Sequence, residues 1–278
     1  TTLYASTGAR DRVDVFTLDA EGYLRDTGKS LINTPTDPKA SLPHHVAGIA
    51  LNADGSRLYA VNNQTAESNG FKGSLSVLNT STGTRIAQVP VGGFPFAVTA
   101  ITQGSNADKK VYVGNERDSS MSVVNPQTLQ VVQTIRVGAQ PVGMLLSPDQ
   151  SRLYVANSGS DTVSVIDTSS DKVTDTFLLN PTRIPGLTPT GLTLIPRANG
   201  EMTLAVTLSD WNTVAFLNAK TGVLQNTLPV GWYPTALAAT PDGKTLFVTN
   251  AKGTQVRNPN SKDVKGWGQY IQDIIEGD

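Results

Sequence analysis

The chain has 278 residues, of which 38% are hydrophobic and 16% charged, so it is long enough for one large β domain or two ordinary domains. Its 22 basic residues are balanced by 23 acidic ones and form no basic block, which argues against nucleic acid as a partner. It contains no cysteine, which excludes disulfides and thiol chemistry, and no apolar run of the roughly 18 residues that a membrane span needs.

A repeated segment organises the whole chain. Its clearest copy is PVGMLLSPDQSRLYVANSGSDTVSVIDTSSDKVTDTFLL, from Pro141 to Leu179. Copies begin at Val46, Pro95, Pro141, Pro189 and Pro234, at intervals of 45 to 49 residues. Residues 1–33 match the last three quarters of a copy, and the copy at Pro234 matches only the first half. Tandem similarity at this period indicates a repeat architecture.

Each copy predicts four short strands. The runs GMLL, LYVAN and VSVID are apolar and rich in β-branched residues, and turn sequences such as SPDQS and TPDGK separate them. The fourth run alternates, as in VVQTIRV, which is typical of an outer strand with one wetted face. No segment keeps a 3.6-residue period for three turns, so helices are not expected.

Four strands in each repeat of this length predict an all-β fold, a β-propeller of four-stranded blades in one domain covering 1–278. Full blades are expected at 44–90, 91–136, 137–182 and 183–229. A partial blade with a linker is expected at 1–43, and a partial blade with a polar tail at 230–278.

The repeat resembles the YVTN-type β-propeller family. The motifs that carry the resemblance are Leu153–Asn157, Val163–Asp167, Leu246–Asn250 and Val111–Asn115. The segment GWYPTALAATPDGKTLFVTNAKG from Gly231, with the later Arg257-Asn258-Pro259 and the YIQDIIEG stretch from Tyr270, is similar to the last propeller blade of bacterial proteins that join such a propeller to an alkaline-phosphatase-like phosphoesterase domain. The resemblance implies a periplasmic or extracellular location. The phosphoesterase domain has no counterpart here, so its metal ligands and nucleophile have no positions in this chain.

Members of that family usually have seven blades, and the repeats here supply fewer. Two arrangements remain open at this point: the ends combine to close a small ring, or a seven-bladed ring is truncated or completed by sequence not present here. We favour the truncated ring, because the strands expected at the two ends do not complement each other.

The loops at one face of such a propeller form the candidate binding site. The loops between blades (GGFPF, GAQP, LTPT, GWYP) and the loops after each second strand (NERDSS, NSGSD, LSDWN, NAKG) should meet at the mouth of the central channel. Taken singly, each of these residues is better explained by a turn-forming role. For the mouth as a whole we favour binding, because aromatic residues there are not needed to pack the blades. The candidate ligand-binding residues are Phe94, Phe96, Asn115, Arg117, Asn157, Asp161, Trp211, Trp232, Tyr233 and Asn250, with Asp118 beside them.

Catalytic and metal-binding signals are weak. Asp54, Asp149 and Asp242 recur at one turn position in different blades, so they do not form an acid–base pair, and we predict no catalytic residue. His44 and His45 are adjacent, which points them to opposite faces of a strand; His45 is a weak candidate for a metal ligand. No cofactor is predicted, and a divalent cation in the channel stays an open alternative.

The sequence therefore favours a non-catalytic binding platform, whose partner is another protein, a missing domain of the same polypeptide or a small ligand at the mouth. Two long polar segments, from Gln64 and from Gly253, are further candidates for partner contacts. The alternatives are a lactonase-like hydrolase that uses a metal in the channel and a structural repeat protein of a surface layer.

Overall fold

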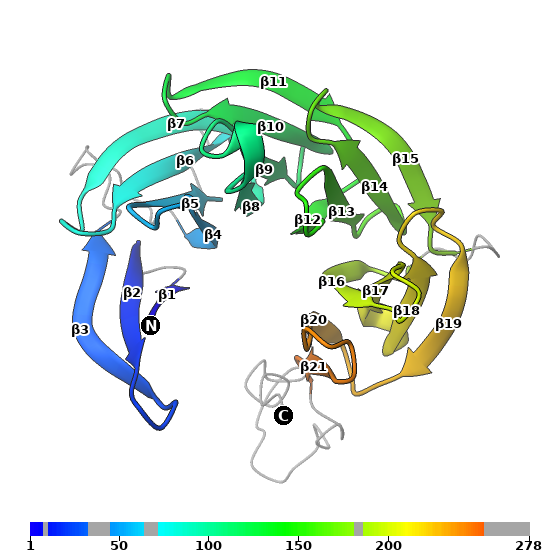
Figure 1. The fold of residues 1–278 in the computed structure, drawn as a ribbon. Coiled ribbons are helices and arrows are strands. Elements are labelled where there is room, and N and C mark those ends of the chain that lie inside the picture. Colours follow the sequence, from blue (N-terminus) through cyan, green and yellow to red (C-terminus); the bar gives the residue numbers. More distant parts are fainter. Residues whose placement is uncertain (8–10, 33–44, 64–71, 181–185, 253–278) are drawn as a thin grey trace, which may run out of the picture.

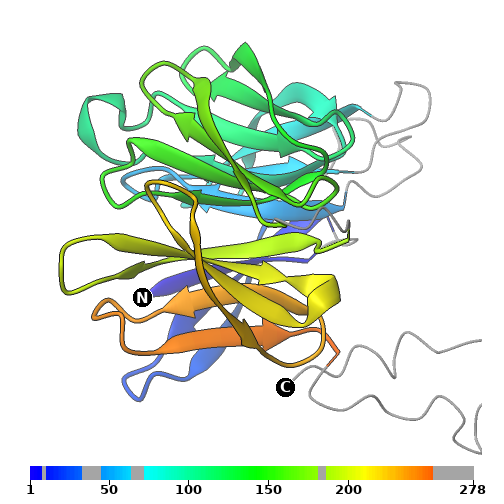
Figure 2. The same ribbon diagram turned by 90° about the vertical axis from the view of Figure 1, so that its right-hand side faces the viewer.

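A computed structural model describes residues 1–7, 11–32, 45–63, 72–180 and 186–252. The described residues form six antiparallel sheets arranged as an open arc around a central axis (Figure 1). Seen from the side, the sheets are stacked face to face along the arc (Figure 2). The fold is a β-propeller, as the repeats predict, and the described residues form an incomplete ring.

The sheets are numbered here as blades in chain order. Blade 1 contains β1 (Thr2–Ser6), β2 (Arg12–Leu18) and β3 (Leu24–Ile32). Blade 2 contains β4 (Val46–Leu51), β5 (Arg57–Asn62), β6 (Lys72–Asn79) and β7 (Arg85–Gly93). Blade 3 contains β8 (Pro95–Ala100), β9 (Val111–Asn115), β10 (Ser120–Asn125) and β11 (Gln130–Arg136).

Blade 4 contains β12 (Pro141–Leu146), β13 (Arg152–Asn157), β14 (Thr162–Asp167) and β15 (Lys172–Leu178). Blade 5 contains β16 (Pro189–Pro196), β17 (Met202–Leu208), β18 (Thr213–Asn218) and β19 (Leu224–Pro229), and blade 6 contains β20 (Pro234–Ala239) and β21 (Leu246–Asn250). The first strands of blades 2 to 6 begin at the residues where the sequence repeats begin. The helical content of the described part is limited to two 3₁₀ turns, at Gly104–Asn106 and Ser209–Trp211.

Burial explains the composition of the strands. In blade 4 the two middle strands, β13 and β14, are buried almost throughout, whereas β15 exposes most of its residues at the outer rim. The apolar clusters lie between neighbouring blades; one of them joins Tyr154 and Val165 of blade 4 to Leu204 and Leu217 of blade 5. Each blade is therefore stabilised mainly by its neighbours, as in other repeat architectures.

Small residues let the first strands approach each other at the channel. The third residue of each first strand is Gly48, Ala97, Gly143, Gly191 or Ala236. A Cβ atom added at Gly143 would lie 2.0 Å from the backbone oxygen of Thr190 in blade 5. One added at Gly191 would lie 2.8 Å from the Cα atom of Ala236. This close approach of main chains fixes the spacing of the blades.

A polar contact joins blades 3 and 4 at the opposite face from the mouth. The Lys110 Nζ atom lies 2.7 Å from the Asp171 Oδ2 atom and donates a second hydrogen bond to the Thr168 carbonyl oxygen, also at 2.7 Å. The Tyr112 hydroxyl donates to the other Asp171 oxygen. Burial and the neighbouring Asp171 carboxylate together raise the pKa of Tyr112 well above its usual range, so the hydroxyl stays protonated.

The two ends of the arc differ from the full blades. Blade 1 lacks a first strand and blade 6 lacks third and fourth strands within the described residues. The side chain of Phe247 in β21 is 60% exposed, whereas Tyr154 at the same repeat position in β13 is 3% exposed. The ends therefore do not complete each other strand for strand in the described part of the chain.

Aspartates in the turns make the stability depend on pH. The Asp167 carboxylate accepts hydrogen bonds from the hydroxyls and backbone N–H groups of Ser169 and Ser170, which lower its pKa to about 2. Hydrogen bonds also lower the pKa values of Asp54, Asp149 and Asp242. These groups contribute stability above the pKa of the unfolded chain, and that stability is lost as the pH falls through the folded pKa.

We expect the urea midpoint to fall as the pH is lowered from about 4 to about 2, because the folded protein must then take up protons at these turns. The variant Asp167→Asn retains an oxygen that accepts the same backbone bonds but has no proton to take up. Its midpoint should fall less steeply over this range. An equal slope in the two proteins would contradict this assignment.

Candidate functional site: the mouth of the propeller

Two sets of loops meet at one face of the arc. In blades 2 to 6 the carbonyl oxygen of the residue just before the first strand accepts a hydrogen bond from the residue that follows the second strand. The pairs are Asn63 to His45 (3.3 Å), Glu116 to Phe94 (3.1 Å), Ser158 to Gln140 (2.9 Å), Ser209 to Thr188 (3.1 Å) and Ala251 to Tyr233 (2.9 Å). The loops between blades and the loops after the second strands therefore lie side by side, as the sequence predicts.

A sharp turn precedes the first strand of each of blades 2 to 6, where the chain enters from the outer strand of the blade before it. The accepting residues His45, Phe94, Gln140, Thr188 and Tyr233 all have positive φ values, between 48° and 55°. This conformation costs a residue with a Cβ atom about 1 to 2 kcal/mol. Because five blades repeat both the conformation and its hydrogen bond, the turn belongs to the framework of the mouth.

Acidic and amide side chains connect the loops of neighbouring blades. The Asp161 carboxylate accepts hydrogen bonds from the backbone N–H groups of Gly186, Leu187 and Thr188, which precede blade 5. At the same repeat position in blade 5, the Asn212 side-chain oxygen accepts the N–H group of Tyr233 at 2.9 Å. Asp161 thus holds the inter-blade loop, and a ligand contact at this residue stays a prediction.

Replacing Asp161 with alanine should lower the free energy of unfolding by about 2 kcal/mol, because three N–H donors lose a charged acceptor. The matched control is Asp161→Asn, which places at this position the side chain that blade 5 uses at Asn212. The asparagine variant should lose less stability than the alanine variant in urea unfolding. Equal losses, or none, would contradict the structural role of the carboxylate.

The predicted asparagines lie beneath the surface of the mouth. Asn115 and Asn157 are fully buried. The Asn115 amide donates to the Ser120 and Ser122 hydroxyls, and the Asn157 amide donates to the Thr162 and Ser164 hydroxyls. Their amides therefore tie second strands to third strands and do not ring the opening, contrary to the arrangement expected from the sequence. A direct ligand contact at either asparagine stays a prediction.

Asn250 occupies the equivalent position in blade 6 and is half-buried. Its Oδ1 atom, like that of Asn157, is buried without a hydrogen-bond partner among the described residues. Its side chain lies against Gly231, because a Cβ atom added at that glycine would be 2.7 Å from the Asn250 amide nitrogen. Asn250 therefore supports the loop that carries Trp232.

The remaining predicted residues are more accessible. Trp211 is 49% exposed, Trp232 45% and Phe96 41%, whereas Phe94 and Tyr233 are half-buried. Arg117 and Asp118 are exposed, and the Asp118 carboxylate accepts the Gly93 N–H group at 2.6 Å. The accessible aromatic rings are not needed to pack the blades.

The loops of blades 5 and 6 gather aromatic and charged side chains. The Lys252 Nζ atom lies 4.6 Å from the centre of the Tyr233 ring, a cation–π contact, and its backbone N–H group donates to the Trp232 carbonyl oxygen. Asp210 accepts a hydrogen bond from the Thr188 hydroxyl. Burial, and then the negative charge of Asp210, raise the pKa of Tyr233. We call Asp210, Trp211, Trp232, Tyr233 and Lys252 the aromatic cluster.

Sequence reasoning did not single out Asp210 or the Lys252 charge. Both are immediate neighbours of motif residues, in SDWN and NAKG, and their positions in two equivalent loops were the available signal.

A cavity of about 490 Å³ opens on the channel, where the first strands of blades 2, 3 and 4 face one another. His45, Phe96 and Met144 lie in its wall. His45 is held by the hydrogen bond from its backbone N–H group to the Asp11 carboxylate, at 3.1 Å. His44 and the segments from Gln64 and from Gly253 lie outside the described residues.

Within the described ranges, no three histidine, aspartate or glutamate side chains gather where they could hold a metal ion. Asp54, Asp149 and Asp242 lie in separate turns, where each accepts hydrogen bonds from its own turn. A search of the same ranges finds no helix long and apolar enough to cross a membrane.

Comparison with known proteins supports a β-propeller family. A family model described as YNCE-like beta-propeller matches residues 83–184. The seven-bladed beta-propeller protein Rv1057 of Mycobacterium tuberculosis is 31% identical over 132 residues, which cover 46% of this chain and 31% of that protein. Antigen Lp49 of Leptospira interrogans is 28% identical over 147 residues, 50% of this chain and 30% of that protein. The matches thus span about a third of each relative.

Among solved structures, a chain of hydrazine synthase from Kuenenia stuttgartiensis aligns over 89% of this chain and 91% of its own length, with a TM-score of 0.49 and 15% identity.

Proposed function

We propose that this chain is a large part of a YVTN-type propeller that acts outside the cytoplasm as a non-catalytic platform and binds a protein or a ligand at the mouth. The observation that carries the proposal is the aromatic cluster. Trp211 and Trp232 expose nearly half of their surface on adjacent loops of one face. Exposed aromatic residues on a rigid framework are typical of binding surfaces.

The backbone of the mouth favours binding of a partner by a fixed surface over binding by flexible loops. The αL turns and the hydrogen bonds between loops hold the loop backbones in the same way in five blades. Tryptophan side chains on such loops lose little further conformational freedom when a partner binds. A pre-organised aromatic surface therefore suits a protein partner, and the channel cavity beside Phe96 suits a smaller ligand.

The resemblance of the last repeat to propellers joined to a phosphoesterase domain supports two further parts of the proposal. One is that the partner is another protein or a further domain of the same polypeptide. The other is a periplasmic or extracellular location. In this proposal the chain presents or positions that partner and performs no chemistry itself.

The double variant Trp211→Ala, Trp232→Ala should lose binding while keeping its unfolding midpoint, because both rings are largely solvated in the free chain. The measurement compares capture of partners from the extracytoplasmic fraction of the source cells by immobilised wild-type and variant chains. The control is Val132→Ala, Leu178→Ala, which removes two exposed side chains from the outer strands β11 and β15. Binding that survives in the mouth variant and disappears in the control would place the binding surface on the rim.

A further inference from the structure

A basic residue and a tyrosine recur at the start of the second strand and reach across to the next blade. In blade 2 the Arg57 Nη1 atom donates to the Pro126 carbonyl oxygen of blade 3 at 3.2 Å. In blade 3, Lys110 and Tyr112 together bind Thr168 and Asp171 of blade 4. Both contacts lie at the face opposite the mouth, where the turn between the third and fourth strands meets the preceding blade.

The next interface has the same framework and lacks the acid. Gly222 in blade 5 occupies the turn position that Asp171 occupies in blade 4. The Gly222 N–H group donates to the Asn218 carbonyl oxygen at 2.8 Å, and the Asp171 N–H group closes the equivalent turn by donating to the Asp167 carbonyl oxygen at 2.9 Å. Both residues have positive φ values, 71° and 55°. The carboxylate that receives a lysine and a tyrosine between blades 3 and 4 therefore has no counterpart between blades 4 and 5.

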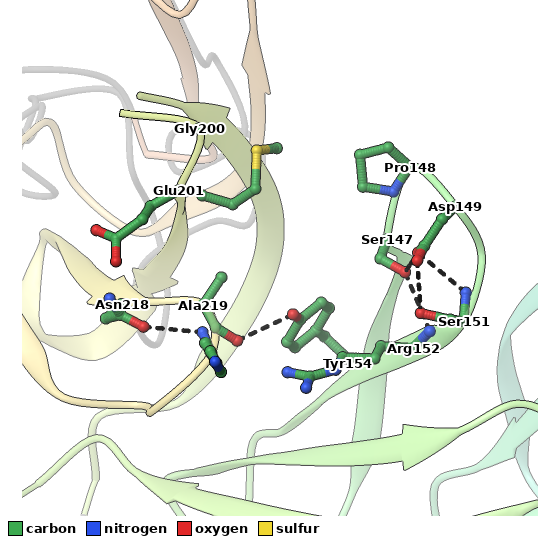
Figure 3. Close-up of a pocket in the computed structure, with 12 residues that line it drawn as sticks. Ser147, Pro148, Asp149, Ser151, Arg152, Tyr154, Gly200, Glu201, Asn218 and Ala219 are labelled. Atoms are coloured by element: carbon green, nitrogen blue, oxygen red, sulfur yellow. Dashed lines mark hydrogen bonds between the residues drawn. The ribbon is translucent and has the colours of Figure 1, made fainter. Parts of the chain in front are cut away.

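The basic residue and the tyrosine that bind the Asp171 carboxylate between blades 3 and 4 do have counterparts between blades 4 and 5, namely Arg152 and Tyr154. The Tyr154 hydroxyl donates to the Ala219 carbonyl oxygen at 3.0 Å, as Figure 3 shows. The charged side chains of Arg152 and Lys220 take part in none of the ion pairs found in the described part of the chain. The Arg152 side chain lies next to the Tyr154 side chain in the cavity (Figure 3), and it opposes the rise in the pKa of Tyr154 that burial causes.

A cavity of about 480 Å³ occupies the space between these groups. Its wall combines Arg152 and Lys220 with the apolar surfaces of Pro148, Tyr154 and Met202. Its volume lies within the range of small-molecule sites. The lining therefore combines two basic side chains and an apolar surface with the carboxylates of Asp149 and Glu201.

The two acidic residues in the wall are already engaged. The Asp149 carboxylate accepts the Ser147 and Ser151 hydroxyls at 2.5 and 2.8 Å, and these bonds lower its pKa. Glu201 accepts a hydrogen bond from the Asn199 amide at 2.9 Å and lies on the opposite wall from Asp149 (Figure 3). Neither carboxylate forms with Arg152 one of the ion pairs found in the described part of the chain.

We propose that the cavity between blades 4 and 5 binds a small carboxylic acid with an apolar body, whose carboxylate pairs with Arg152 as Asp171 pairs with Lys110. The planar guanidinium suits a carboxylate, since both oxygens can accept hydrogen bonds from it. The apolar part of the ligand lies against Met202, Pro148 and the Tyr154 ring. This site is independent of the mouth, because it lies at the other end of the strands.

Calorimetric titration with 3-phenylpropionate and with the neutral 3-phenylpropionamide tests the proposal. The acid should bind at least about tenfold more tightly than the amide, because only the acid pairs with the guanidinium. Arg152→Gln should abolish this preference. The matched control is Arg57→Gln, which changes the equivalent residue between blades 2 and 3. This variant should keep the preference for the acid over the amide.

A second variant fills the cavity with the chain's own carboxylate. A Cβ atom at Gly222 would lie 2.2 Å from the Phe177 ring, so Gly222→Asp is combined with Phe177→Ile, which copies Ile135 of blade 3. This variant should lose binding of the acid while remaining folded. Equal binding of acid and amide, retained preference in Arg152→Gln, or no binding of the acid to the wild type at millimolar concentration would overturn the proposal.

Discussion

The variant Gly143→Ala is expected to unfold at a much lower urea concentration than the wild type, with a loss of about 3 kcal/mol in the free energy of unfolding. The added methyl group would meet the Thr190 backbone oxygen at 2.0 Å. Backbone in a neighbouring first strand cannot rotate away as a side chain can, so blades 4 and 5 must separate. That movement also loosens the apolar cluster between Tyr154 and Leu204.

The control for this prediction is Gly114→Ala, another strand glycine. A Cβ atom there would lie 3.2 Å from the nearest atom, the Pro141 oxygen, and 3.5 Å from the flexible Met144 side chain. Its effect should be small. If both alanine variants unfolded at the wild-type midpoint, the close packing of first strands around the channel would not describe the protein in solution.

The second large effect is expected for Asp171→Ala, with a loss of about 3 kcal/mol. The side chains of Lys110 and Asp171 are only 17% and 11% exposed. Removal of the carboxylate would leave a poorly solvated ammonium group and the Tyr112 hydroxyl without their charged partner. Denaturant unfolding of the variant measures the loss.

Two companion variants separate the ion pair from a general effect of substitution. Asp175→Ala removes an exposed carboxylate from the same blade and should change the midpoint little. Tyr112→Phe removes only the hydroxyl, and we expect it to cost about 1 kcal/mol. A loss in Asp175→Ala as large as that in Asp171→Ala would argue against the buried contact between blades 3 and 4.

The blades could be predicted from the sequence because each strand carries its own pattern. The first strands start at Val46, Pro95, Pro141, Pro189 and Pro234, where the repeats begin. The apolar runs at Leu153–Asn157 and Val163–Asp167 became the buried middle strands of blade 4. Strand length, turn residues and the apolar pattern of each strand are all local properties of the sequence, and they agree in every full repeat.

The orientation of the polar mouth residues could not be read in the same way. Asn157 ends β13 and Asp161 follows it by four residues, yet the first binds hydroxyl groups within its blade and the second binds backbone that precedes the next blade. The cavity at Arg152 lies where the next blade has Gly222 at the position that Asp171 occupies in blade 4. The sequence shows that difference, but only the structure shows that this turn packs against the blade that carries Arg152.

The most direct test of the proposed role of the mouth is site-specific photo-cross-linking in the cells that produce the protein. A photoreactive amino acid is placed at Trp232 in one variant and at Val132, on the outer strand β11, in another. The proposed function predicts a discrete cross-linked partner for the variant at 232 and none for the variant at 132. A partner captured only from position 132 would contradict the mouth as the binding surface.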